Sequence, residues 1–168
     1  MILELNWENL GDMEEGRPTF GPDCPVLIYR LLQFSLRNVI ETELGEGKGA
    51  TYLYKAGQLA GKLIYDKFLA DIKDLEELLK KLADLLYEFK VCVLRVEKSD
   101  PSKGEYVITA GEDLDCSGVP EIGWPICNFD EGFVAGILSV FTGKNVRCRE
   151  VDCWATGERT CRIDVKIG

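Results

Sequence analysis

The stretch CREVDCWATGERTC, which runs from Cys148 to Cys161, indicates how the C-terminal part of the chain folds. Cys153 and Cys161 lie at equal distances from Gly157. A reversal at this glycine would place the two cysteines opposite each other on antiparallel strands, with their side chains on the same face. Such a pair could bind a metal ion or form a disulfide, and buried free thiols are the third interpretation.

Two further residues could complete a metal site with this pair. Cys127 precedes a predicted helix, where backbone N–H groups and the helix dipole stabilise a thiolate. Glu150 is a candidate fourth donor, but strict strand alternation turns it to the face opposite Cys153. We therefore expect a bulge around Val151 and Asp152 if both side chains bind the same ion.

Two other cysteines are expected to lie outside this site. Cys148 belongs to the same predicted strand and is interpreted as a bystander. Cys116 lies in the irregular segment DCSGVPEIGWP, residues 115–125. We interpret it as an ordinary loop cysteine, with a reactive thiol as the alternative.

The remaining sequence predicts an α+β domain. Apolar residues recur at helical spacing in three N-terminal segments, and Asp74 is a plausible N-cap for the third. The order of elements predicts one domain over residues 1–168, with an antiparallel sheet packed against a helical layer. The expected helices are 25–44, 51–69, 74–89 and 126–142, and the expected strands are 91–98, 105–112, 145–154 and 158–167.

Gly57 and Gly61 lie four residues apart in the second predicted helix, so they share one face and would let another helix approach closely. Packing within the chain and a homodimer interface are the two interpretations of this pair.

The composition limits the chemistry that the chain can perform. No histidine is present, which removes Ser-His and Cys-His nucleophile systems and leaves thiolates and carboxylates as ligands for a transition metal. Seven cysteines, an odd number, fit thiols or metal ligands in a reducing compartment better than a disulfide framework. No glycine fingerprint for a dinucleotide is present, so an enzyme is the less favoured expectation.

The charge balance bears on partners and location. With 20 basic and 29 acidic residues the net charge is −9, which disfavours nucleic acid and anionic membranes. No segment has the roughly 20 apolar residues that a transmembrane helix needs. We expect a cytoplasmic protein without a membrane span. A late group of basic residues is interpreted as one solvated strand face: Arg147, Arg149, Arg159, Arg162 and Lys166.

The segment Cys127–Val165 resembles the C-terminal motif of the 4-vinyl reductase, or hydrocarbon-binding, domain family. The motif is a cysteine, a Gly-Phe pair, a further glycine and Glu-x2-Cys-x7-Cys. It is present here as Cys127, Gly132-Phe133, Gly136, Glu150, Cys153 and Cys161. The resemblance implies a structural Zn²⁺ bound by Cys127, Glu150, Cys153 and Cys161. It also implies a fold similar to that of TRAPP vesicle-tethering subunits, with an internal apolar pocket.

The resemblance leads to one functional expectation and two alternatives. We expect a stand-alone small-molecule sensor that binds a hydrocarbon, aromatic or pigment-like molecule without catalysis. The alternatives are a homodimeric protein-interaction module with a vestigial pocket and an accessory protein of tetrapyrrole biosynthesis. The aromatic residues that flank the loop and hairpin are candidates for the pocket: Tyr106, Trp124, Phe129, Phe133 and Trp154.

Overall fold

The computed structural model describes residues 3–168, and the chain divides into two compact units. The first unit extends to Gly49 and the second covers Ala50–Gly168. Each unit is described by itself.

The first unit is helical. Its two short helices have side-chain caps, because the Asn6 amide oxygen and an Asp12 carboxylate oxygen accept the N–H groups of Asn9 and Glu15 at 2.8 and 2.9 Å. The long third helix confirms the predicted helix 25–44: it starts after Pro25 and ends before Gly45. The elements are α1 (Trp7–Leu10), α2 (Met13–Gly16) and α3 (Val26–Leu44).

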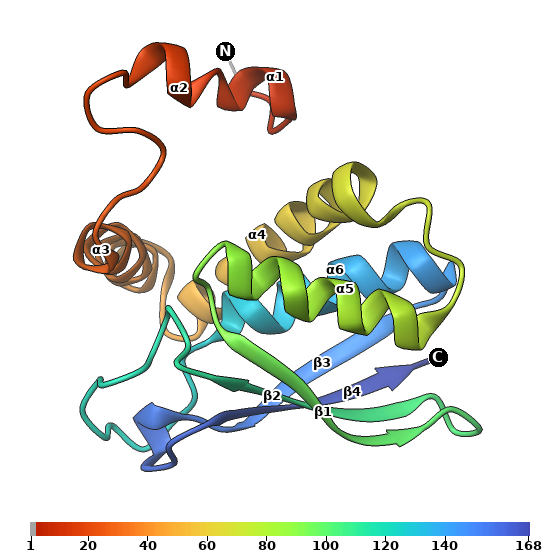
Figure 1. Cartoon of the computed structure of the whole chain (residues 1–168). Helices are drawn as coiled ribbons and strands as arrows, with labels where there is room; N and C mark the ends of the chain where they lie inside the picture. Colours follow the sequence, from red (N-terminus) through yellow and green to blue (C-terminus); the bar gives the residue numbers. More distant parts are fainter. Residues whose placement is uncertain (1–2) are drawn as a thin grey trace. The chain divides into compact units, whose positions relative to one another are not determined.

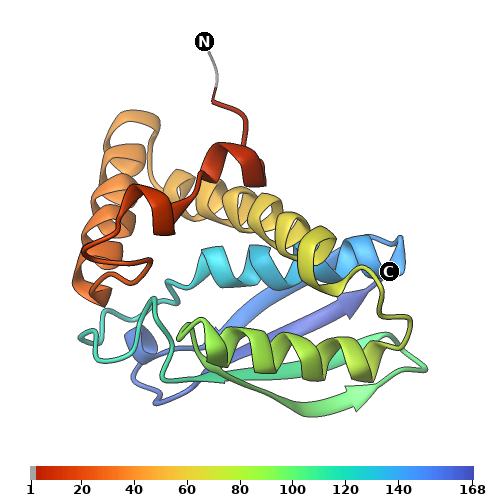
Figure 2. The ribbon, with the colours of Figure 1, turned by 45° about the horizontal axis from the view of Figure 1, so that its top comes forward.

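The second unit is a four-stranded sheet with helices on one face, as Figures 1 and 2 show. The strand order is β1-β2-β4-β3, and every neighbouring pair is antiparallel. The predicted fold class is therefore confirmed. The elements are α4 (Lys48–Ile64), a π-helical turn (Tyr65–Leu69), α5 (Leu75–Glu88), β1 (Val93–Asp100), β2 (Glu105–Gly111), α6 (Asn128–Thr142), β3 (Val146–Asp152) and β4 (Cys161–Ile167).

The core lies between this sheet and the helices α5 and α6. Alternate residues of β2, β3 and β4 are buried, as expected for a sheet with one covered face. α5 begins at the predicted N-cap, where Asp74 Oδ1 accepts the N–H of Glu77 at 2.9 Å. Its apolar stripe contributes Leu78 and Leu82 to the core.

A close glycine contact holds α4 against α6. A Cβ atom added at Gly57 would lie 2.0 Å from the Phe129 carbonyl oxygen, and one added at Gly132 would lie 1.9 Å from the Tyr54 carbonyl oxygen. Gly61 and Gly136 also lie close to backbone atoms of the opposite helix. The face shared by Gly57 and Gly61 is therefore occupied within the chain, which is the first of the two interpretations given above.

The C-terminal hairpin is irregular where alternation was expected to fail. β3 pairs with β4 in one register up to Glu150 and in a shifted register at Asp152, which opposes Arg162. This is the predicted bulge. The reversal is wider than a tight hairpin, because a 3₁₀ turn, Trp154–Thr156, separates β3 from β4. Both strands are therefore shorter at the turn than the sequence predicts.

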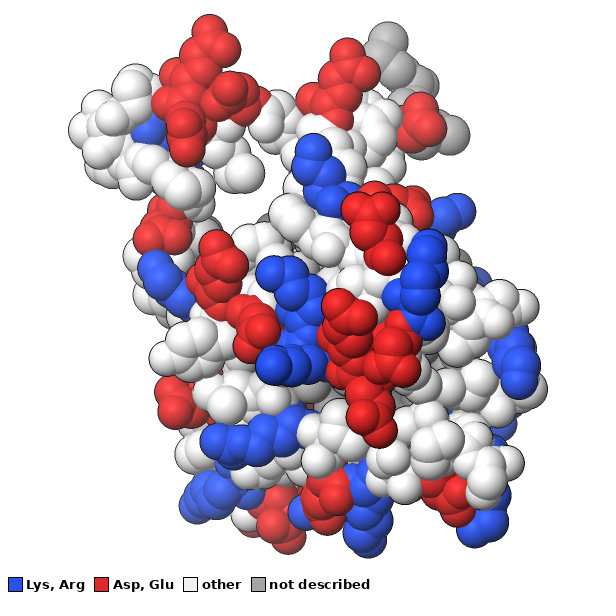
Figure 3. All heavy atoms as spheres, turned by 45° about the vertical axis from the view of Figure 1, so that its right-hand side comes forward, with Lys and Arg blue, Asp and Glu red and all other residues white. Residues whose placement is uncertain are grey.

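The surface carries both signs of charge. Acidic and basic side chains are interspersed on the face shown in Figure 3. Within residues 3–168, none of the helices combines the length and the apolar character needed to cross a bilayer.

Candidate metal centre

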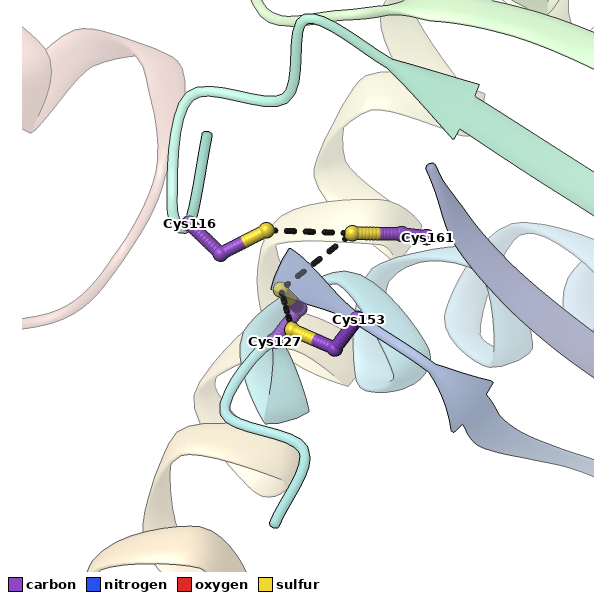
Figure 4. Close-up of side chains that lie close together, drawn as sticks. All are labelled: Cys116, Cys127, Cys153 and Cys161. Carbon is purple, nitrogen blue, oxygen red and sulfur yellow. Dashed lines mark hydrogen bonds between the residues drawn. The ribbon is translucent and has the colours of Figure 1, made fainter. Parts of the chain in front are cut away.

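Four cysteine side chains converge beside the N-terminal end of α6 (Figure 4). Cys116 comes from the loop between β2 and α6, and Cys127 directly precedes α6. Cys153 follows β3, and Cys161 is the first residue of β4. Their Sγ atoms all lie within 4.8 Å of one another, and all four residues are buried. We call this group the cysteine cluster.

The sulfur spacing fits a single metal ion. The Sγ atoms of Cys127 and Cys153 are 3.7 Å apart, those of Cys127 and Cys161 are 3.7 Å apart, and those of Cys116 and Cys161 are 3.1 Å apart. Zn–S bonds of about 2.3 Å in a tetrahedron place sulfur atoms about 3.8 Å apart. A disulfide would need about 2.05 Å, and all four cysteines are free.

The bulge brings Glu150 to the edge of the cysteine cluster. Its side chain is only 3% exposed. Oε2 accepts the backbone N–H of Cys127 at 3.0 Å, and the carboxyl group also contacts the thiols of Cys127 and Cys161. Oε1 is buried and has no hydrogen-bond partner. Burial, followed by the charge of Cys153, raises the pKa of Glu150 to about 8.

Cys116 was not among the ligands predicted from the sequence. The structure brings together three of the four predicted donors as thiols, places Glu150 beside them and adds Cys116 as the fourth sulfur. The only available signal was the segment Asp115-Cys116-Ser117-Gly118, which resembles an element of the family's pigment-biosynthesis members.

Asp113 shapes the loop that carries Cys116. Its Oδ1 accepts the backbone N–H groups of Asp115 and Cys116 at 2.9 and 3.1 Å, and the Cys127 thiol donates to the same oxygen at 3.8 Å. Burial and the neighbouring Asp115 raise the pKa of Asp113 to about 6. These contacts turn the loop so that the Cys116 side chain enters the cysteine cluster.

The local charges favour a cation. Within residues 3–168, the buried side chains that carry charge are all acidic: Asp113, Asp115, Glu131 and Glu150. Four buried thiols and buried carboxylates, one of them with an unpartnered oxygen, lack a buried base to balance them. Thiolates select soft or borderline metals, so the donor set fits Zn²⁺.

The five predicted pocket aromatics lie at separate places in the second unit. Tyr106 is buried under α5, whereas Trp124 is 61% exposed. Phe129 and Phe133 stack with ring centroids 6.4 Å apart on α6. Trp154 is half-buried and lies under the guanidinium of Arg159, 4.5 Å from the ring centroid.

Tyr106 lines a groove between α5 and the edge of the sheet. The groove has a cavity volume of about 330 Å³. Apolar side chains form most of it, and charged side chains stand beside them. Its lining residues, which define the α5 groove, are Glu76, Leu79, Lys80, Ala83, Leu94, Arg95, Val96, Ser99 and Tyr106.

The fold and the cluster define an α+β domain with a candidate thiolate metal centre. Residues 106–167, which contain the cysteine cluster, match the family model of the 4-vinyl reductase domain. The chain belongs to the 4-vinyl reductase family, as predicted from its C-terminal motif.

Known proteins with similar sequence or fold agree with this assignment. An uncharacterised protein of Methanocaldococcus jannaschii, MJ1642, is 27% identical over 88% of this chain and 80% of its own length. A vinyl-4-reductase family protein from the same organism has a similar fold, with a TM-score of 0.63, 18% identity and coverage of 99% of this chain and 98% of that chain.

Two further solved structures have the same fold. The phenol-responsive sensory domain of the transcription activator PoxR, solved with phenol, gives a TM-score of 0.65 at 18% identity, covering 86% of this chain and 76% of that chain. A trafficking protein particle complex subunit 3 from Naegleria fowleri, covalently bound to palmitic acid, gives 0.62 at 18% identity, covering 86% and 97%. The predicted similarity to TRAPP subunits is confirmed at the level of the fold.

Proposed function

We propose that this protein is a non-catalytic binding domain for a small hydrophobic molecule, stabilised by a structural zinc ion in the cysteine cluster. The convergence of four buried thiols is the observation that carries the proposal. Four protein ligands would fill a tetrahedral site and leave no position for a reacting water, so the ion would have a structural role.

The zinc ion would join segments that are distant in the sequence. Cys153 and Cys161 belong to the hairpin, Cys127 to the start of α6, and Cys116 to the preceding loop. A metal bound by these residues would tie the hairpin, the helix and the loop together, and its binding free energy would contribute directly to folding.

A matched pair of variants tests the metal. Cys153→Ala removes a thiol from the cysteine cluster, whereas Cys148→Ala removes a buried thiol from β3 outside it. We expect metal analysis to give about one zinc per chain for the wild type and Cys148→Ala, and almost none for Cys153→Ala. Equal metal content in the two variants would refute the site.

The α5 groove is the proposed ligand site. Its volume of about 330 Å³ lies at the lower end of the roughly 300–1,000 Å³ of small-molecule pockets. Leu79, Ala83 and Tyr106 provide apolar surface, and Lys80 and Arg95 provide positive charge at the same place. Two of the structural neighbours bind small apolar molecules, phenol and palmitic acid, which supports a ligand of this class.

Native mass spectrometry of the protein purified from cells tests ligand binding. We expect a retained hydrophobic molecule, or, after its extraction, uptake of an apolar fluorescent probe such as anilinonaphthalene sulfonate. A protein that arrives empty and takes up no probe would contradict the proposal. Binding of a porphyrin or chlorophyllide precursor in place of simpler apolar compounds would favour the tetrapyrrole alternative.

We also propose a homodimer, because α3 exposes a row of apolar side chains. Leu27, Leu31 and Leu32 are 65%, 58% and 68% exposed, respectively. Burial of such side chains against a second copy would release each from water, at roughly 1.5–3 kcal/mol per side chain. Sedimentation should show a dimer for the wild type and a monomer for Leu31→Glu. A monomeric wild type at high concentration would contradict it.

A further inference from the structure

Five donor groups surround a site that needs four. The cysteine cluster supplies four thiols, and Glu150 is in contact with two of them, those of Cys127 and Cys161. Zn²⁺ in structural sites is almost always four-coordinate. If the cluster holds one ion, one of the five groups is therefore surplus at any moment.

The buried carboxyl oxygen of Glu150 identifies the first of the exchangeable groups. Oε2 is used by the backbone N–H of Cys127, but Oε1 has no partner although Glu150 is only 3% exposed. A buried polar atom without a hydrogen-bond partner is unfavourable, because it has lost its water and gained nothing in return. Binding to a metal ion in the adjacent cluster would remove this cost.

Glu150 is firmly positioned for such a role. It belongs to β3 and opposes Ile163 of β4. Its own N–H donates to Glu131 Oε1 at 2.6 Å, and the register shift follows directly after it. The carboxyl group therefore stays beside the cluster through the sheet and not through a loop.

Cys116 is the second exchangeable group, because it is attached differently from the other three thiols. Cys127 adjoins α6, while Cys153 and Cys161 adjoin strands of the sheet. Cys116 lies in the loop between β2 and α6, where the bonds near it are local: Ser117 N–H to the Asp113 carbonyl oxygen, and Val119 N–H to the Cys116 carbonyl oxygen. This turn can move without breaking the sheet or α6.

We propose that Cys116 and Glu150 are alternative fourth ligands of one metal ion, the first from the loop and the second from the sheet. This inference rests on the proposed metal site. With Cys116 bound, the loop is held against the hairpin, and with Glu150 bound, the loop is released while the ion stays in place. Each of the two groups is satisfied in one state and spare in the other.

A double-mutant cycle on metal affinity tests the exchange. The variants are Cys116→Ala, Glu150→Gln and the double variant, with Cys148→Ala as the control for loss of a buried thiol outside the cluster. Zinc affinity is measured by competition with a chelator. We expect each single variant to retain one zinc per chain within about tenfold of the wild-type affinity, and the double variant to lose at least about 100-fold.

Zinc absorption spectroscopy gives a readout that a purely structural role would not change. The wild type and Glu150→Gln should have four sulfur neighbours, and Cys116→Ala should have three sulfurs and one oxygen. Hydrogen exchange of residues 113–119 should be faster in metal-loaded Cys116→Ala than in the wild type, with exchange in β3 and β4 unchanged.

The possible failures are distinguishable. A wild type that holds no zinc refutes the proposed metal site itself. A wild type that holds zinc refutes the exchange in either of two cases. In the first, Glu150→Gln costs nothing in the Cys116→Ala background, so that water fills the fourth position. In the second, Glu150→Gln costs as much with Cys116 present as without it.

Discussion

The cysteine cluster and the α5 groove, both in the unit Ala50–Gly168, are built on opposite principles. The cluster gathers buried sulfur atoms that can be satisfied only by one another, by Glu150 or by an ion. The groove is an open depression of about 330 Å³, in which most surface is apolar and the charged groups stand near water. The cluster therefore demands one arrangement, whereas the groove tolerates many.

This difference separates stability from specificity. A fault in the cluster should unfold or loosen the domain, because buried donors lose their partner. A fault in the groove should change what the protein binds while the fold persists, since exposed or half-buried apolar positions tolerate substitution. The following four predictions test this separation, from the largest expected effect to the smallest.

Removal of a cluster thiol should have the largest effect. Cys161→Ala should abolish metal binding and remove about 4 kcal/mol of stabilisation, which corresponds to about 8–16 °C in melting temperature for a chain of this size. The control is Cys92→Ala, which removes a buried thiol outside the cluster. Calorimetry that gives the same loss for both variants would show that only packing is at stake.

Disruption of the α4–α6 contact should be the next largest effect. Gly132→Ala would place a Cβ 1.9 Å from the Tyr54 carbonyl oxygen. The helices must separate, at a cost of about 3 kcal/mol or more in unfolding free energy. Gly16→Ala, where an added Cβ meets nothing within 4 Å, is the control and should change stability by less than about 0.5 kcal/mol. Equal denaturation midpoints for both variants would contradict the close contact.

Filling of the α5 groove should affect binding without affecting the fold. Ala83→Phe places a ring in the groove and should weaken probe binding by about tenfold, equivalent to about 1.4 kcal/mol. Lys81→Phe adds the same ring to α5 at a position that does not line the groove. If fluorescence titration shows equal binding for the two variants, the ligand site lies elsewhere.

Loss of the surface ion pairs near the bulge should have the smallest effect. Arg162 pairs with Glu97 at 2.8 Å and with Asp152, and its side chain is 37% exposed. Such pairs contribute roughly 0–1 kcal/mol and are screened by salt. Arg162→Gln should therefore lower stability by less than about 1 kcal/mol and leave the metal content unchanged. A loss of metal would mean that the pairs hold the bulge in place.

Local chemistry explains which parts of the cluster the sequence predicts. The spacing of Cys153 and Cys161 about Gly157 depends only on the hairpin, and the conflict between Glu150 and Cys153 required the bulge that the structure has. These inferences need no knowledge of distant residues, because strand geometry alone relates the positions.

The parts that the sequence did not predict depend on contacts between distant segments. Cys116 reaches the cluster because Asp113 turns its loop, and turns of this kind have no periodic signal. Gly132 and Gly136 repeat the spacing of Gly57 and Gly61, but only the packed helices show that the pairs face each other.

The α5 groove was missed for the same reason. Helix α5 and the edge strand β1 form it together, and one of the five predicted pocket aromatics, Tyr106, lines it. Aromatic residues close in sequence to the hairpin were expected to share a cavity, yet Trp124 is exposed and Trp154 lies under Arg159. Proximity along the chain does not fix which face of a sheet or helix a ring occupies.

Native mass spectrometry of the wild-type protein, compared with the same protein after acid denaturation, tests the central claim most directly. The account predicts that the native chain carries the mass of one zinc ion, and that the four thiols of the cluster become reactive toward an alkylating agent only when the ion is removed. A folded native chain with no metal and with an unchanged melting temperature in the presence of a chelator would contradict it.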